Sequence, residues 1–460
     1  MRAKLSAAIR PLTRIAADNS ATSHGPPPWR NWAGNQTARP SRLARPDSVE
    51  ELQASVTAAR GDGLRVKPLG AGHSFTAIAA TDGVHLDLTG LDRLVRADRA
   101  TGLVTVEGGL PIDRLNRILL DHDLGLPNLG DIDRQTITGA IATGTHGTGA
   151  QLGGLAAAVA GFDVVTAGGE LVHADWDTQP ELFAAGRVSL GALGVVARVT
   201  LQCVPAFRLH AAEGSMPLHD VLERIDELVD AHDHFEFYWF PHTPCTLTKA
   251  NDRVPPDAAA RPPGRLRAWI DDELLSNRAF ELVNRIGARR PALVPCINAI
   301  SGRALSAREY VDDSYRVFAS RRRVRFVEME YAIPRAAVAD ALRAVRRWID
   351  STGTPVSFPI EVRFAAADDG WLSTAYERES AYIAVHLYHR ADQPAYFEAV
   401  EAIMAEHAGR PHWGKLHGLD AVTLRERYPR FDDFRAVRAE LDPNGVFGNA
   451  YLDRVLGPID

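Results

Sequence analysis

Alternating hydrophobic and polar positions in the first half of the chain predict short strands and helices. Leu52 and Val56 fall on one side of a helix, and the Asp47-x-x-Glu50 pattern before them is typical of a helix cap. Further strands are predicted at 84–88, 104–106 and from 195, with a helix over 111–121 and a hairpin around 168–169. Residues 29–206 therefore predict an α+β unit.

The second half of the chain has a different order of elements. A helical period over residues 218–228 precedes an apolar strand over 235–239. Residues 251–310 give no clear period, and their paired prolines indicate a loop that serves as a lid or linker. A strand over 324–333, a helix from Pro334 to 349 and a strand over 354–364 then follow one another. This succession predicts a second domain built on a sheet.

Two of these predicted strands carry polar side chains on one face. In the first, Glu361 and Arg363 project together because side chains alternate between the two faces of a strand. In a further strand over 382–388, His386 and Tyr388 share a face. These faces line a cavity if they turn the same way, and the alternative is a solvated surface with an ion pair.

A glycine loop with one histidine follows the first predicted strands. Paired glycines permit positive φ and expose consecutive N–H groups, which suits a pyrophosphate. The loop lacks the third glycine of a nicotinamide-type dinucleotide fingerprint, because Phe75 stands there. Its members are Pro68, Leu69, Gly70, Ala71, Gly72, His73 and Ser74.

A run of small residues over 138–149 has the right character to lie against a flat ligand. His146 is its only bulky polar side chain. Further along, Gly409-Arg410-Pro411-His412-Trp413-Gly414-Lys415 combines a rigid backbone with an aromatic ring and cationic side chains. Because surface loops rarely contain a tryptophan in such a setting, the segment indicates a site.

Together these segments resemble the vanillyl-alcohol-oxidase superfamily of FAD enzymes, and the Glu-x-Arg and His-Trp-Gly-Lys motifs resemble its sugar-lactone and alditol branch. Further matching stretches are 31–35, 189–194, 329–331 and 441–443. The resemblance implies an α+β, two-domain FAD-binding fold, with a PCMH-type FAD domain and a substrate-binding (cap) domain built on an antiparallel sheet.

The resemblance also implies the cofactor and its residues. FAD is expected to be bound covalently through His73. The other expected cofactor-binding residues are Pro68, Leu69, Gly70, Ala71, Gly72, Ser74, Gly130, Asp131, Thr136, Gly139, Ala140, Ile141, Ala142, His146 and Val196. Gly130 leaves space where an alanine would shield the flavin, which favours dioxygen as the electron acceptor over an electron-carrier protein.

The implied reaction is hydride transfer from a sugar lactone. Arg363 and Lys415 are expected to stabilise developing negative charge, and Glu361 to orient substrate hydroxyls and hold both cations. His386 and His412 are expected to support the site or handle protons. Tyr388, bulkier than the small hydroxyl residue of alditol oxidases, favours a compact lactone. An alditol oxidase and a flavin-binding protein without turnover are the alternatives.

Composition narrows the remaining possibilities. The 460-residue chain has 45% hydrophobic and 24% charged residues and a net charge of -6, without the basic stripe of a nucleic-acid-binding protein. Three separated cysteines predict neither a metal site nor disulfides, which fits the cytoplasm. No apolar run is long enough for an integral membrane segment, which leaves peripheral association open.

The predicted organisation has four parts. Residues 1–28 are expected to form a flexible extension and residues 29–206 the FAD-binding domain. Residues 207–408 are expected to form the cap domain. Residues 409–460 are expected to return to the FAD domain and the active site.

Overall fold

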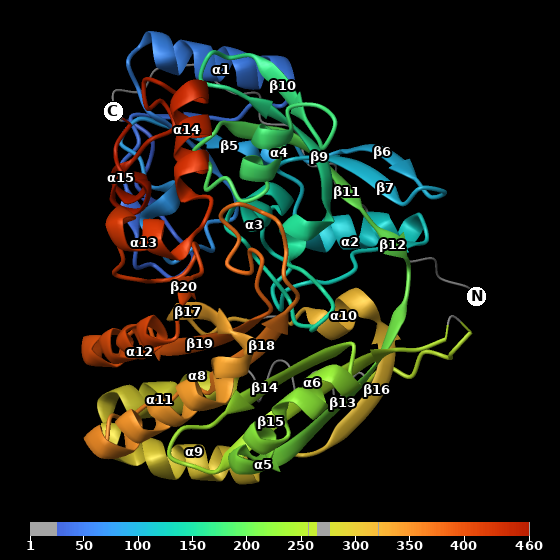
Figure 1. Cartoon of the computed structure of the whole chain (residues 1–460), viewed down its shortest axis with the longest axis vertical. Helices are drawn as coiled ribbons and strands as arrows, with labels where there is room; N and C mark the ends of the chain where they lie inside the picture. Colours follow the sequence, from blue (N-terminus) through green and yellow to red (C-terminus); the bar gives the residue numbers. More distant parts are fainter. Residues whose placement is uncertain (1–24, 256, 265–276, 321, 460) are drawn as a thin grey trace, which may run out of the picture.

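The computed structural model describes residues 25–255, 257–264, 277–320 and 322–459. The predicted extension lies outside the described residues except for residues 25–28. Two large sheets dominate the described chain. In Figure 1 the N-terminal sheet occupies the upper part of the molecule and the second sheet the lower part.

The upper part contains a five-stranded antiparallel sheet and a three-stranded parallel one. The first has the order β10 (Leu171–Ala174), β9 (Val159–Val165), β11 (Val195–Gln202), β7 (Leu103–Glu107) and β6 (Leu94–Asp98). The second has the order β3 (Arg42–Ala44), β5 (Val84–Asp87) and β4 (Val66–Leu69). The predicted hairpin at 168–169 joins β9 to β10. Cys203 directly follows β11 and is buried.

The first helix begins one residue away from the predicted cap. Helix α1 (Val49–Gly61) is capped by Ser48, which accepts a hydrogen bond from the Glu51 N–H, and Glu51 accepts one from the Asp47 N–H. The expected pairing of Asp47 with Glu50 is therefore wrong, although the capping-box chemistry is the same. Leu52 and Val56 are buried as predicted, against the three-stranded sheet.

The lower part is an eight-stranded antiparallel sheet. Its order is β16 (Arg308–Asp313), β13 (Arg208–Pro217), β15 (Cys245–Arg253), β14 (His234–Trp239), β18 (Ile360–Ala365), β19 (Ser380–Tyr388), β17 (Phe326–Pro334) and β20 (Arg410–Pro411). The apolar faces of α5 (Leu218–Glu223), α6 (Ile225–Ala231), α11 (Val338–Thr352) and α12 (Pro394–Glu406) complete its core.

Several boundaries here differ from the prediction. The helix expected over 218–228 is broken at Arg224, whose backbone leaves the helical region. The strand expected over 354–364 begins only at Ile360, because Pro359 has no N–H to give to a sheet. The helix expected at Pro334 begins at Val338, after a 3₁₀ turn.

The segment over 251–310, which has no clear period, contains regular structure. It includes the end of β15, α8 (Phe280–Arg289), α9 (Val294–Arg303) and the start of β16, which the sequence pattern does not predict. Asn298 connects helix α9 to the segments that follow β14 and precede β18, because its amide donates to the carbonyls of Pro241 and Val356, both at 2.9 Å. Pro262 and Pro263 do lie outside helices and strands.

The last part of the chain passes from the lower sheet to the upper core. After β20, helices α13 (Ala421–Arg427), α14 (Phe431–Leu441) and α15 (Ala450–Leu456) pack beside the N-terminal part (Figure 1). Asn449 donates to the carbonyls of Ala77, Ile78 and Ala80. The segment between β20 and α13 therefore lies at the junction of the two parts, where the Phe75 N–H donates to the Gly414 carbonyl at 2.7 Å.

Candidate active site

A cavity of about 880 Å³ runs along the glycine loop in the upper part. The predicted cofactor residues that line it are Pro68, Gly70, Ala71, Gly72, His73, Ser74, Thr136, Gly139, Ala142 and Val196. The structure does not bring Leu69, Ala140 or Ile141 to this wall; Ala140 and Ile141 face the core.

Glycines give this cavity a backbone wall that fits a flat dinucleotide. Gly72, Gly191 and Gly194 line it with φ of +68°, +61° and +145°, values that side chains disfavour. A Cβ on Gly139 would lie 2.8 Å from Thr136 Oγ1. The residues present therefore fit FAD, and the wall includes Lys67, whose ammonium donates to the Gly191 and Phe447 carbonyls.

His73 lies where this cavity meets a second one. Its side chain lines both cavities and stacks on Trp32, with ring centroids 5.6 Å apart. Burial, aided by the positive charge of Lys415, lowers the pKa of His73 to about 4. The imidazole is therefore neutral at neutral pH and keeps a free electron pair, as a nucleophile requires.

The second cavity has a volume of about 690 Å³ and a strongly charged lining. Seven predicted site residues besides His73 and Ser74 meet there: Gly130, Asp131, His146, Glu361, Arg363, His412 and Lys415. His386 lies behind this lining, with Nε2 3.6 Å from Glu328 Oε1. Gly130, Asp131 and His146, predicted as cofactor residues, thus line the second cavity rather than the first.

Tyr388 is not brought to the second cavity. Its hydroxyl donates to Glu281 Oε1 of α8 at 2.5 Å, and its ring packs in the apolar cluster behind Phe75 and Phe326. The strand period is as predicted, but two residues beyond His386 the strand has moved on by about 7 Å. The bulk of Tyr388 therefore does not distinguish lactones from polyols.

Arg363 is the centre of a buried charge cluster. Its guanidinium pairs with Glu361, with Glu236 Oε2 at 2.8 Å and with Asp131 Oδ2 at 3.4 Å. Asp131 also pairs with Arg322. Burial alone would raise the pKa of Asp131, but these two arginines hold it well below its usual value, so the carboxylate is ionised.

Lys415 has a separate carboxylate partner. Its ammonium pairs with Glu328 of β17, while Glu361 accepts from Arg363 and, at 3.0 Å, from the Tyr238 hydroxyl. The expectation that Glu361 holds both cations is therefore wrong. Burial raises the pKa of Glu328 to about 7, although Lys415 opposes the shift.

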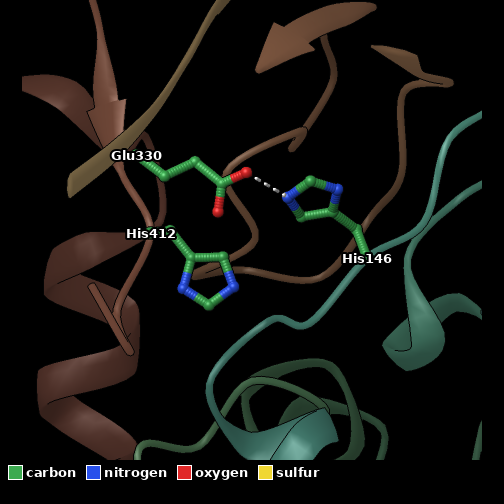
Figure 2. Close-up of side chains that lie close together, drawn as sticks. All are labelled: His146, Glu330 and His412. Atoms are coloured by element: carbon green, nitrogen blue, oxygen red, sulfur yellow. Dashed lines mark ion pairs between the residues drawn. The ribbon is translucent and has the colours of Figure 1, made fainter. Parts of the chain in front are cut away.

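His146, Glu330 and His412 form a third buried group (Figure 2). His146 Nε2 lies 3.3 Å from Glu330 Oε1, and the His146 ring stacks on Tyr382. Two histidines and a carboxylate are a donor set that divalent metals use. However, His412 Nδ1 accepts the Gly414 N–H at 3.0 Å, so the neutral ring carries its proton on Nε2 and offers no free pair. We assign the group to hydrogen bonding rather than to metal ligation.

Several charged residues of the site were not predicted, although their sequence pattern contained a signal. Glu236, Glu328 and Glu330 each stand between apolar residues of a strand, as Glu361 does. A carboxylate repeated within an apolar strand indicates a polar face turned into a cavity. Arg322 has no comparable pattern, because it lies in a segment between α10 (Ser314–Phe318) and β17.

Comparisons with known proteins agree with this geometry. Residues 199–455 match the D-arabinono-1,4-lactone oxidase family model, and residues 40–175 match an FAD binding domain. L-gulono-1,4-lactone dehydrogenase from Mycobacterium tuberculosis is 48% identical over 94% of this chain and 100% of that protein. L-gulonolactone oxidase from Bos taurus is 34% identical over 93% of this chain and 98% of that protein.

Solved structures with the same fold have more distant sequences. Cholesterol oxidase from Brevibacterium sterolicum superposes with a TM-score of 0.77 at 18% identity, covering 93% of this chain and 96% of that one. The lactone oxidase family model, the FAD binding domain and the relatives define an FAD-dependent oxidoreductase. The chain belongs to the aldonolactone oxidase and dehydrogenase family. Among the described residues, no helix is long and apolar enough to cross a membrane.

Proposed function

We propose that this enzyme oxidises the C2 hydroxyl of an aldono-1,4-lactone of the L-gulono or D-arabinono type. The observation that carries the proposal is the second cavity, where Arg363 and Lys415 meet paired carboxylates next to His73. The 48% identity to an L-gulono-1,4-lactone dehydrogenase supports the lactone class. The product is a 2-keto lactone, which enolises to an ascorbate-type compound.

The charged side chains of the second cavity have different roles in the proposed reaction. FAD, when bound in the first cavity, accepts the hydride. Arg363 and Lys415 both line this cavity, and fixed cations there would stabilise negative charge on the substrate oxygen more in the transition state than in the ground state. Glu361 accepts hydrogen bonds from substrate hydroxyls and orients the ring.

An anaerobic absorbance spectrum tests the proposal. L-gulono-1,4-lactone and D-arabinono-1,4-lactone are expected to bleach the flavin band, and air is then admitted. An alditol oxidase from Streptomyces is 33% identical over 93% of this chain, so xylitol and sorbitol belong in the same panel. Bleaching by polyols alone would replace the lactone with a polyol substrate. A flavin band that no sugar bleaches would favour a binding protein without turnover.

We also propose that FAD is bonded covalently to His73. The neutral imidazole at the junction of the two cavities supports this attachment. Wild-type protein is expected to keep its yellow colour after acid precipitation, and His73→Ala to release all its flavin, because the only bonding nitrogen is removed. Flavin release from wild type under the same conditions would contradict the covalent link.

Dioxygen is the electron acceptor that we propose, with an electron-carrier protein as the alternative. A Cβ on Gly130 would lie 3.2 Å from the His146 carbonyl and 3.4 Å from Thr145 Cγ2, so an alanine would crowd this wall of the second cavity. Gly130→Ala is expected to slow the reoxidation of reduced flavin by air about tenfold, equal to about 1.4 kcal/mol of barrier. Stopped-flow mixing with oxygenated buffer measures this rate.

The control for the Gly130 variant is the reductive half-reaction, in which the lactone reduces the flavin. Anaerobic flavin reduction by lactone should keep its wild-type rate, since Gly130 contributes no side chain to the substrate. Wild-type reduced flavin that air fails to reoxidise would identify a dehydrogenase.

A further inference from the structure

Glu328 is a buried carboxylate that has no role in the reaction proposed for the second cavity. It projects from the third residue of β17 into the second cavity and is 5% exposed. Lys415 pairs with its Oε2. Its Oε1 accepts no hydrogen bond from the described residues, and the nearest polar atom across from it is His386 Nε2 at 3.6 Å. One oxygen is therefore held in place while the other is available.

The charge balance of the cavity leaves one carboxylate in excess. Among the described residues, five carboxylates and four permanent cations meet there and directly behind it. The carboxylates are Asp131, Glu236, Glu328, Glu330 and Glu361; the cations are Lys249, Arg322, Arg363 and Lys415. Since a buried uncompensated charge is costly, the cluster is expected to hold one further proton, either on a carboxylate or on His146 beside Glu330.

The contacts distinguish Glu328 from the other four carboxylates. Arg363 contacts Asp131, Glu236 and Glu361, and the first two have a second cation, Arg322 or Lys249. Glu330 faces His146, which holds its pKa well below the usual value although burial would raise it. Glu361 has two donors, Arg363 and Tyr238, whereas Lys415 is the one donor to Glu328 among the described residues.

We propose that Glu328 is a catalytic base of the lactone oxidation, an inference that rests on the proposed function. Its Oε1 accepts the proton of the substrate C2 hydroxyl as the C2–H bond breaks. The hydrogen on C2 leaves with both electrons of the C2–H bond and passes as hydride to FAD. The electron pair of the former O–H bond stays on oxygen and forms the carbonyl, so the carboxylate ends as a carboxylic acid and the cofactor as reduced flavin.

Neighbouring groups suit Glu328 to this role. Both ring nitrogens of His386 are buried without a hydrogen-bond partner among the described residues, so Nε2 can accept from the protonated carboxyl. His386 is thus a positioning residue. The groups that face Glu328 are Lys415, His386, Glu330 and Glu361, and their net effect with burial is a pKa of about 7. A base with a pKa near the working pH is the most effective.

The two histidines expected to handle protons are weaker candidates. Burial lowers the pKa of His386 and of His412 to about 3 in each case. In addition, Nδ1 of His412 already accepts the Gly414 N–H. Each ring therefore remains neutral through the pH range in which the enzyme is expected to work, and neither binds the substrate proton well.

Glu328→Gln in the FAD-loaded enzyme tests the proposal, because the amide keeps the size of the side chain but cannot take up the proton. Flavin reduction by L-gulono-1,4-lactone is followed anaerobically across the neutral pH range. In wild type, the rate constant should rise with pH through an ionisation near 7, since only the carboxylate can accept a proton. The variant should be slower by about 10²–10⁴-fold and lose this dependence.

Two further measurements keep the test decisive. Infrared spectra of the unreacted holoenzyme should contain a protonated-carboxyl band that disappears as pH rises through 7 and is absent from Glu328→Gln. Glu361→Gln, the matched control, should raise KM and keep the ionisation near 7. If Glu328→Gln fails to fold, Glu328→Asp replaces it as the test variant and should retain the pH dependence, because it keeps a carboxylate. The infrared titration of the wild type needs no variant.

Three outcomes would overturn the assignment: a wild-type pH dependence in Glu328→Gln, its loss in Glu361→Gln instead, or no titrating carboxyl band in wild type. Wild-type flavin that no lactone reduces would refute the proposed function instead. In that case the infrared titration alone decides whether Glu328 carries a proton near neutral pH.

Discussion

Arg363→Met is expected to slow flavin reduction by the lactone about 10²–10³-fold, the loss typical when one donor to a developing oxyanion is removed. The same change should lower the free energy of unfolding by about 3–5 kcal/mol, because a buried ion pair that loses one partner leaves an uncompensated charge. Three carboxylates, Asp131, Glu236 and Glu361, lose a shared cation. Stopped-flow absorbance and urea unfolding measure the two effects.

Two control variants separate the charge of Arg363 from its shape and its burial. Arg363→Lys keeps a cation but cannot contact several carboxylates with one planar group, so its rate should lie between those of wild type and Arg363→Met. Arg438→Met removes another buried arginine, which donates to the Gly457 carbonyl at 3.0 Å in the C-terminal region. It should destabilise the protein without slowing flavin reduction. Equal rate losses in Arg438→Met and Arg363→Met would reduce the role of Arg363 to stability.

The charge cluster around Arg363 indicates which contacts the side-chain alternation of a single strand can predict and which it cannot. The period of two residues places Glu361 and Arg363 together from the sequence alone, and the structure gives them a direct ion pair. Glu236 could not be added in the same way, because β14 and β18 are neighbours only through the strand order of the finished sheet. Residues 127 positions apart then share one hydrogen bond.

The glycine loop is predictable for a different reason. Its conformation is local, so the positive φ of Gly72 follows from sequence, as does the position of His73 after a strand. Where the loop points depends on distant residues. Gly414, which follows the His412-Trp413 pair, accepts the Phe75 N–H, and this contact brings Lys415 to the same cavity as His73. No periodicity in the sequence encodes that contact.

The misplacement of Tyr388 has a simple geometric cause. Period-two alternation tells which face of a strand a side chain occupies but not where along the strand a cavity ends. His386 lies at the rear edge of the site, and by Tyr388 the same face is covered by Phe326 and α8. Helix α8 falls in the segment that has no readable period, so the sequence could not predict that this helix covers Tyr388.

Lys415→Met is expected to lower the rate constant of flavin reduction by about 10²–10³-fold, since it removes the second cation next to the reacting atoms. The change should also shift the pH at which Glu328 titrates. Lys415 favours the ionised form of Glu328, so its loss raises the pKa of that carboxyl above about 7. A higher pKa means that the carboxyl keeps its proton to higher pH, and the pH at which flavin reduction becomes fast should rise accordingly.

The direction of this pH shift separates two roles of Lys415. If the ammonium acted only on the substrate oxygen, the rate would fall while the midpoint of the pH profile stayed near the wild-type value. If it also tunes the carboxyl with which it pairs, the rate falls and the midpoint rises together. Lys415→Arg should restore the midpoint because it restores a cation beside Glu328, even where its larger head group fits the substrate less well. A midpoint that falls in Lys415→Met would contradict both roles.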